Sequence, residues 1–233
     1  LMVRTPNFKR WFGDWENHPE NASKVVDANG EPLVVYHGTP HGGFSVFRLT
    51  NRVGAFFSSS LKGAAFYAGS VDKKNYYPVF LNIRNPYIFD AKGRYWAELG
   101  DVWIKDNKTG EIIKTDKTGQ PFMSSADAKD FVDDFLNDND KNRYDVQHDK
   151  KLNTTDNIIR AVWNGELGNA NHDGVIFRNV CDPYVAIDEF ITRTPNNIKS
   201  AVKNNGDFSE ALDIYKQSVL KSDDFMLTPE AKR

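Results

Sequence analysis

Three separated segments carry side chains that could act together on a flat, positively charged group. Residues 36–39 read Tyr-His-Gly-Thr and end an apolar run, Phe56 and Tyr67 lie eleven positions apart, and Glu189 precedes a short apolar run. The faces of aromatic rings attract cations, and a carboxylate stabilises positive charge that develops in a transition state. The set is therefore suited to binding a flat organic cation beside a carboxylate that could stabilise developing positive charge.

Other common catalytic chemistries lack their motifs. No GxGxxG follows an expected strand, and GxxxxGK[ST] and GxSxG are absent, which argues against a Rossmann fold, a P-loop NTPase and an α/β-hydrolase. His37 and His41 have the spacing of a zinc HExxH motif, but the Gly-Thr-Pro between them prevents a helix and supplies no glutamate. Cys181 is the single cysteine, so we expect a buried structural thiol, no internal disulfide and no metal site.

The bulk composition is that of an ordinary globular domain. The chain has 233 residues, of which 39% are hydrophobic and 27% charged, with a net charge of −2. This balance predicts no general attraction to nucleic acid or to anionic membranes. Its apolar runs are far shorter than the ~20 residues that span a bilayer, and the N-terminus has no continuous apolar segment typical of a signal peptide. We expect no membrane partner, a cytoplasmic location, a monomer, and a segment cut from a longer protein.

Local patterns predict the elements that must position these residues. Thr5-Pro6 caps an amphipathic helix over about 6–16, and Ser60 caps a helix over 61–68 that carries Tyr67. Ser125 and Thr155 begin two further helices, and the acidic stretch 127–149 is interpreted as a solvated helix face and loop. Strands are expected at 32–36, 54–58, 77–83, 87–89, 175–177, 184–187 and 190–192, a hairpin at 100–116, and a final helix at 208–220.

Strands at both ends of the chain with helices between them indicate an α+β fold. We expect a single domain over 1–206 with a variable insertion at about 91–165. Residues 207–233 would form a C-terminal helix or tail, or a linker to a further domain.

Longer blocks of sequence carry a family resemblance, and they lie at 8–14, 24–27, 30–39, 173–177 and 195–201. On these blocks the chain, over about residues 7–209, resembles the ADP-ribosyltransferase superfamily, in the His-Tyr-Glu branch of diphtheria toxin and the poly-ADP-ribose polymerases. It looks similar in particular to the ADP-ribosyltransferase domains of phage polyvalent proteins and polymorphic toxins. The resemblance implies a split β-sandwich or barrel of two antiparallel sheets with peripheral helices.

The resemblance also implies NAD as substrate and assigns roles to the residues. Phe56 and Tyr67 match the positions that flank the nicotinamide, and His37 matches the histidine that hydrogen-bonds a ribose hydroxyl. Glu189 matches the carboxylate beside the ribose 2′-OH, which stabilises an oxocarbenium-like ribose.

Weaker assignments concern the neighbours of the histidine and the diphosphate. Gly38 lets the backbone approach the carboxamide of nicotinamide closely, and Thr39 supplies an extra hydrogen bond. Arg52, or alternatively Arg48, would meet the diphosphate.

Two positions depart from relatives in the superfamily. Phe56 stands where the branch usually has tyrosine, and Ile187 stands where arginine-modifying relatives place glutamate or glutamine, which argues against arginine as the acceptor. Each site residue also has an ordinary explanation on its own: a strand-end histidine, core aromatics, or an exposed acid with Asp188 as a competitor.

These observations predict a mono-ADP-ribosyltransferase that acts on a macromolecule, with protein preferred to nucleic acid as the acceptor. Two alternatives stay open at this point: an NAD glycohydrolase, in which water is the acceptor, and a non-catalytic domain that binds NAD or a partner. Delivery into a target cell, by phage injection or by secretion, is an expectation that comes from the resemblance alone.

Overall fold

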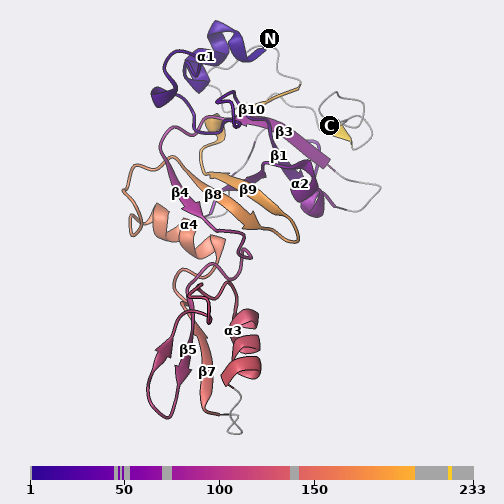
Figure 1. The fold of residues 1–233 in the computed structure, drawn as a ribbon. Coiled ribbons are helices and arrows are strands. Elements are labelled where there is room, and N and C mark those ends of the chain that lie inside the picture. The colour runs from indigo at the N-terminus through magenta and orange to yellow at the C-terminus, as the bar shows by residue number, and fades with distance from the viewer. Residues whose placement is uncertain are drawn as a thin grey trace.

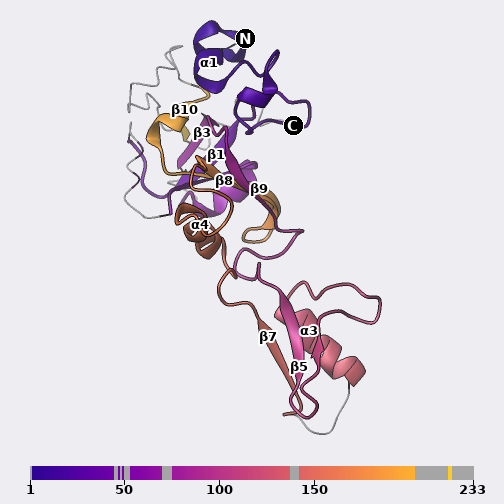
Figure 2. The same ribbon diagram turned by 90° about the vertical axis from the view of Figure 1, so that its left-hand side faces the viewer.

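The chain forms a body built on a large sheet and a smaller lobe that extends from one end of it (Figure 1, Figure 2). This computed structural model describes residues 2–44, 47, 49, 53–69, 75–136 and 142–202, and the backbone of residues 220–221. Among these residues, no helix has the length and apolarity needed to cross a membrane.

The sheet of the body has eight described strands in the order β10-β3-β1-β2-β9-β8-β4, with β11 also paired to β3. All neighbours are antiparallel except β4 and β8, which are parallel. The strands are β1 (Val35–Thr39), β2 (Ala55–Ser58), β3 (Asn75–Leu81), β4 (Pro86–Asp90), β8 (Gly174–Cys181), β9 (Ala186–Thr192), β10 (Ile198–Ser200) and β11 (Leu220–Lys221).

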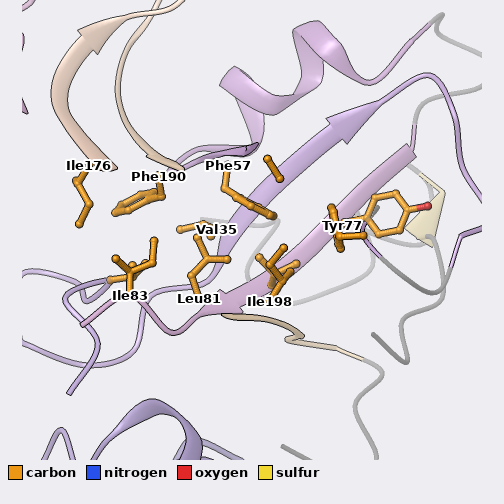
Figure 3. Close-up of a cluster of buried hydrophobic side chains, with 12 residues drawn as sticks. Val35, Phe57, Tyr77, Leu81, Ile83, Ile176, Phe190 and Ile198 are labelled. Atoms are coloured by element: carbon orange, nitrogen blue, oxygen red, sulfur yellow. The ribbon is translucent and has the colours of Figure 1, made fainter. Parts of the chain in front are cut away.

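The sheet divides into two halves that face each other across a shared core. β1 and β2 are joined at a single register pair, Tyr36 with Ser58. Apolar side chains of β1, β3 and β10 meet those of β2, β8 and β9 in one buried cluster, which Figure 3 shows from the side, with Phe57, Ile176 and Phe190 on one side of it. The predicted α+β class is confirmed. The sheet differs in two details from the expected pair of antiparallel sheets. The two halves share a hydrogen-bonded junction, and β4 runs parallel to β8.

The N-terminal helix α1 (Pro6–Phe12) begins as predicted, with the Thr5 hydroxyl accepting the Phe8 N–H at 3.3 Å. It ends four residues before the predicted end because Gly13 has a φ of 101°, outside the helical region. Its buried aromatic side chains pack against Phe80 of β3 and so close one end of the body.

The remaining helices are α2 (Leu61–Tyr67), α3 (Ser125–Phe131) and α4 (Thr155–Trp163). Ser60, Ser124 and Thr154 cap them through their side-chain oxygens, so α3 and α4 begin within a residue of the predicted starts. A π-helical turn (Val132–Leu136) continues α3, and short 3-10 turns occur at Met2–Arg4, Pro19–Asn21 and Pro195–Asn197.

The lobe is a three-stranded sheet in the order β6-β5-β7 with α3 packed on it. Its strands are β5 (Val102–Asp106), β6 (Ile112–Ile113) and β7 (Tyr144–His148). β7 was not predicted, because the interpretation of 127–149 as helix face and loop overlooked the alternation of Tyr144 and Val146. The lobe lies within the predicted insertion 91–165, but so does α4, which packs on the strands β8 and β9 of the body.

Strands β8 and β9 form one long hairpin where three short strands were predicted. The register shifts between Phe177 and Val180, and Asn179 there has a φ of 51°. The chain then turns through Asp182–Val185, where the Asp182–Pro183 peptide is cis. The predicted helix over 208–220 lies outside the described residues, apart from Leu220 in β11.

Candidate active site

One cavity of about 920 Å³ opens beside the junction of the two half-sheets. Its lining includes His37 from β1, Phe56 from β2, Tyr67 from α2 and Glu189 from β9. The volume lies in the range of small-molecule and cofactor sites, about 300–1,000 Å³. Four predicted residues that are far apart in the sequence therefore share a single concave site.

His37 has a fixed tautomer. Its Nδ1 lies 2.8 Å from the Phe56 carbonyl oxygen, and because a carbonyl only accepts, Nδ1 carries the hydrogen. In the neutral ring, Nε2 is then a hydrogen-bond acceptor. Burial lowers the pKa of His37, and the hydrogen bond to Phe56 only partly offsets that effect. The neutral ring is suited to accept a hydrogen bond from a hydroxyl group.

Two aromatic rings reach the cavity from adjacent elements. Phe57 belongs to the core between the half-sheets and also borders the cavity. Its neighbour Phe56 projects from the opposite face of β2, where it packs beside the β8–β9 cluster and lines the cavity. Tyr67 is the last residue of α2 and is 45% exposed. Its hydroxyl donates to Asp182 Oδ1 at 2.7 Å. Partial burial and, next, that hydrogen bond raise the pKa of Tyr67, so the hydroxyl remains a donor.

Glu189 is buried although it carries an ionisable carboxyl. It is 5% exposed and lies between Ser58 of β2 and Phe177 of β8 in the sheet. Burial, followed by the hydrogen bond and charge of Asp182, raises the pKa of Glu189 well above its ordinary value. An acid in such an environment has a strongly perturbed proton affinity, which is common at functional sites.

The competing acid Asp188 points away from the cavity. Its carboxylate accepts from Arg178 Nη1 at 2.6 Å and from the Asn179 N–H at 2.9 Å. Successive residues of a strand face opposite sides, so Asp188 and Glu189 cannot serve the same site. The choice of Glu189 over Asp188 is thus supported by the direction of the side chains.

Gly38 also lines the cavity, and its backbone lies directly against α2. A Cβ built at this position would overlap the Ala64 carbonyl oxygen. The same Cβ would lie 2.8 Å from the Ala64 carbonyl carbon and 3.2 Å from the Ala68 nitrogen. Close packing of β1 against the α2 backbone therefore requires glycine here, in addition to the predicted approach of a ligand.

One further predicted contact, that of Thr39, is not assembled with this group. Thr39 is not among the residues that line the cavity. Its Oγ1 accepts the His41 N–H at 3.2 Å, and its backbone pairs with Asn75 of β3, so the side chain stabilises the turn after β1. Arg52 and its alternative Arg48 lie outside the described residues.

The sequence interpretation missed Asp182, which is 6% exposed and lines the same cavity. It lies in the turn between β8 and β9, where the Tyr67 hydroxyl and the Glu189 carboxyl both contact it. The Asp182-Pro183 pair indicates a turn, but nothing in the sequence indicates that the turn folds back onto the site.

Charge on the described lining is acidic. Asp156, Asp182 and Glu189 contribute carboxyl groups, and no lysine or arginine lines the cavity within the described part of the chain. Negative charge next to aromatic rings suits a flat organic cation. The described residues also contain no cluster of three or more histidine, cysteine or acidic side chains that could hold a metal.

Comparison with known proteins agrees with this arrangement. Residues 27–208 match the family model described as ADP-ribosyltransferase in polyvalent proteins, and that range contains every residue that lines the cavity. Neither the curated proteins nor the solved structures gave a match. Because the matched range covers well over half of its length, the chain belongs to this family of ADP-ribosyltransferases.

Proposed function

We propose that the chain is a mono-ADP-ribosyltransferase of the His-Tyr-Glu type, which cleaves NAD at the nicotinamide–ribose bond and transfers ADP-ribose to a macromolecule. The observation that carries the proposal is the convergence of His37, Phe56, Tyr67 and Glu189 on one cavity from four different elements. Membership of the ADP-ribosyltransferase family gives the reaction class.

The rings and the histidine account for binding. Phe56 and Tyr67 would hold the cationic nicotinamide ring between them, an interaction favoured by the negative faces of aromatic rings. The neutral His37 would accept a hydrogen bond from a ribose hydroxyl at Nε2, because Nδ1 donates to Phe56. Nicotinamide loses its charge on leaving, so stacking contributes binding and orientation but no rate acceleration.

Glu189 would supply the rate acceleration. As the glycosidic bond breaks, its electron pair leaves with nicotinamide, which becomes neutral, and positive charge develops on the ribose. An ionised carboxylate beside the 2′-OH stabilises that charge. The acceptor then forms a bond to C1 of the ribose and loses its proton. Because the pKa of Glu189 is raised, the rate should increase with pH until this carboxyl is ionised.

The charge on the lining favours a protein acceptor over a nucleic acid. The described lining of the cavity contains the acids Asp156, Asp182 and Glu189 and no lysine or arginine. Phosphates would be repelled from that side of the cavity, whereas a polypeptide has no such uniform negative charge. Protein is therefore the acceptor class that we propose.

The test is incubation of the chain with NAD labelled in the adenylate part and with a cell lysate. We expect labelled protein and an equal release of nicotinamide. Glu189→Gln should lower both by about 10²-fold or more, the effect typical of removing one group that stabilises transition-state charge. Asp188→Asn is the matched control, because its side chain lies on the opposite face of β9 and contacts Arg178; it should retain activity.

Three outcomes discriminate the alternatives. Nicotinamide release without labelled macromolecule would indicate an NAD glycohydrolase. Binding of NAD without nicotinamide release would indicate a non-catalytic domain. Full activity in Glu189→Gln would contradict the role given to that carboxyl, whether the enzyme is a transferase or a glycohydrolase.

A further inference from the structure

The cavity contains a second buried carboxyl group that the proposed reaction does not yet use. Asp182 is 6% exposed, similar to Glu189 at 5%, and both side chains line the cavity. Asp182 belongs to the β8–β9 turn, whereas Glu189 lies within β9. A buried acid needs a partner that compensates for its lost hydration, and the two partners of Asp182 are themselves site residues.

The first partner is Tyr67. Its hydroxyl donates to Asp182 Oδ1 at 2.7 Å, a length typical of a strong O–H···O⁻ hydrogen bond. Tyr67 is the last residue of α2 and is 45% exposed, so surrounding side chains enclose only part of its ring. An anchor at the hydroxyl therefore restricts the orientation of this ring, which would otherwise retain rotamer freedom at a helix end.

The second partner is Glu189, which lines the same cavity and is buried like Asp182. Burial and then the hydrogen bond and charge of Asp182 raise the pKa of Glu189, because ionising this carboxyl would place two negative charges close together away from water. Other ionisable groups near the pair are the hydroxyls of Tyr67 and Tyr95, with His37 and Asp156 on the same cavity. No lysine or arginine belongs to the described lining, so no such positive charge compensates for the negative charge of Asp182 and Glu189.

We propose that Asp182 is a positioning residue of the transferase site: it fixes the Tyr67 ring through the hydroxyl, and from its place beside Glu189 in the same cavity it disfavours the ionised form of that carboxyl in the NAD-free protein. The inference rests on the proposed function, because both partners act there on NAD. It adds a pH-setting role, since Glu189 must lose its proton before it can stabilise the cationic ribose. Binding of the cationic nicotinamide end should favour that loss, and the proton would pass to solvent.

Two substitutions separate the two roles. Asp182→Asn keeps an oxygen that accepts from Tyr67 but removes the acid beside Glu189. We expect the acid limb of kcat/KM against pH to move down by roughly one unit or more, as for the removal of a neighbouring like charge, with KM on the plateau little changed. Tyr67→Phe keeps the ring but removes the anchor, and we expect KM for NAD to rise several-fold at every pH.

A titration of the protein alone keeps this inference distinct from the proposed function. With ¹³C-labelled carboxyl groups, Glu189 of the NAD-free wild type should titrate well above the ordinary glutamate range. In Asp182→Asn the Glu189 titration should move to lower pH. Failure of the wild type to release nicotinamide would refute the proposed function but would leave this titration as a test.

Two results would overturn the inference. One is titration of Glu189 in the ordinary glutamate range in the wild type, a measurement that needs no variant and so does not depend on the folding of Asp182→Asn. The other is an active Asp182→Asn enzyme with the pH profile and the Glu189 titration of the wild type. Isothermal titration of NAD in buffers of different ionisation enthalpy should also show proton release on binding to the wild type, and less to Asp182→Asn.

Discussion

Replacing Gly38 with alanine tests how the two halves of the site are held together. Gly38 follows His37 on β1, and α2, which ends at Tyr67, packs on its backbone. The added Cβ would overlap the carbonyl of Ala64 and come within 3.2 Å of the Ala68 nitrogen. Both are backbone atoms, so the whole helix must move, and no side-chain rotation can relieve the contact.

The expected loss of stability follows from that geometry. Overpacking that requires backbone shifts destabilises a protein by about 1–3 kcal/mol. For a chain of this size each kcal/mol lowers Tm by roughly 2–4 °C, so thermal unfolding should occur some 2–12 °C earlier. Displacement of α2 also moves Tyr67, and we expect KM for NAD to rise in parallel.

Gly63→Ala is the matched control, in α2 itself. Its new Cβ would meet the Ser58 hydroxyl oxygen at 2.6 Å and the Ile187 Cδ1 at 3.0 Å. Those atoms end side chains and can rotate, and alanine is favoured over glycine in a helix by about 0.8–1.0 kcal/mol. Its Tm should therefore change less than that of Gly38→Ala.

The assay is thermal unfolding of both variants by circular dichroism, with NAD binding measured on the folded protein. If Gly38→Ala unfolds at the wild-type temperature but no longer binds NAD, glycine is required for the approach of the ligand and the packing argument is wrong. Wild-type stability together with wild-type affinity would refute the described contact between β1 and α2 altogether.

Three further predictions concern protonation. Because burial lowers the pKa of His37, NAD affinity should be lost as pH falls only below about 6.5, the ordinary histidine value. A His37-dependent loss above that pH, seen in KM profiles of wild type and His37→Gln, would contradict the lowered pKa. The Arg143 hydrogen bond holds the pKa of Asp106 at about 2. The contribution of Asp106 to the stability of the lobe should therefore be present above pH of about 4 and be lost as pH falls toward about 2. Amide spectra of β5 and β7 that are unchanged in Asp106→Asn would disprove this. Glu189 has a raised pKa, so wild-type stability should decline as pH rises above about 4.3; Glu189→Gln should raise Tm at pH 7, and an equal or lower Tm would count against a buried, proton-binding carboxyl.

Much of the body could be predicted because its signals are local. Thr5 and Ser60 cap helices whose first turns lie immediately after them, and alternation along β2 places Phe56 and Phe57 in two different apolar clusters. Such patterns need only a few neighbouring residues to be interpreted. The late strands were harder, because a register shift near Asn179 interrupts the alternation within β8.

The lobe shows where local signals fail. β7 contains only two inward-facing apolar residues, Tyr144 and Val146, in a stretch rich in aspartate. Its strand conformation depends on pairing with β5, more than thirty residues earlier in the chain. Pairing partners at that separation leave no mark on the local pattern, so the sequence favoured a solvated loop.

The grouping of His37, Tyr67 and Glu189 at one cavity was predicted because these residues repeat a family pattern. The position of Asp182 was not predicted, because it depends on tertiary geometry. Glu189 could be chosen over Asp188 from its neighbours, but the proximity of Asp182 arises only when the β8–β9 hairpin folds back beside the end of α2. This placement has an energetic consequence. A second buried acid next to Glu189 destabilises the ionised state that the proposed reaction needs, so this placement would be unfavourable unless Asp182 served the site. The hydrogen bond from Tyr67 gives Asp182 such a role. Through it, the ring that would bind the cationic nicotinamide is linked to the acid beside Glu189, the carboxyl that would stabilise the ribose cation.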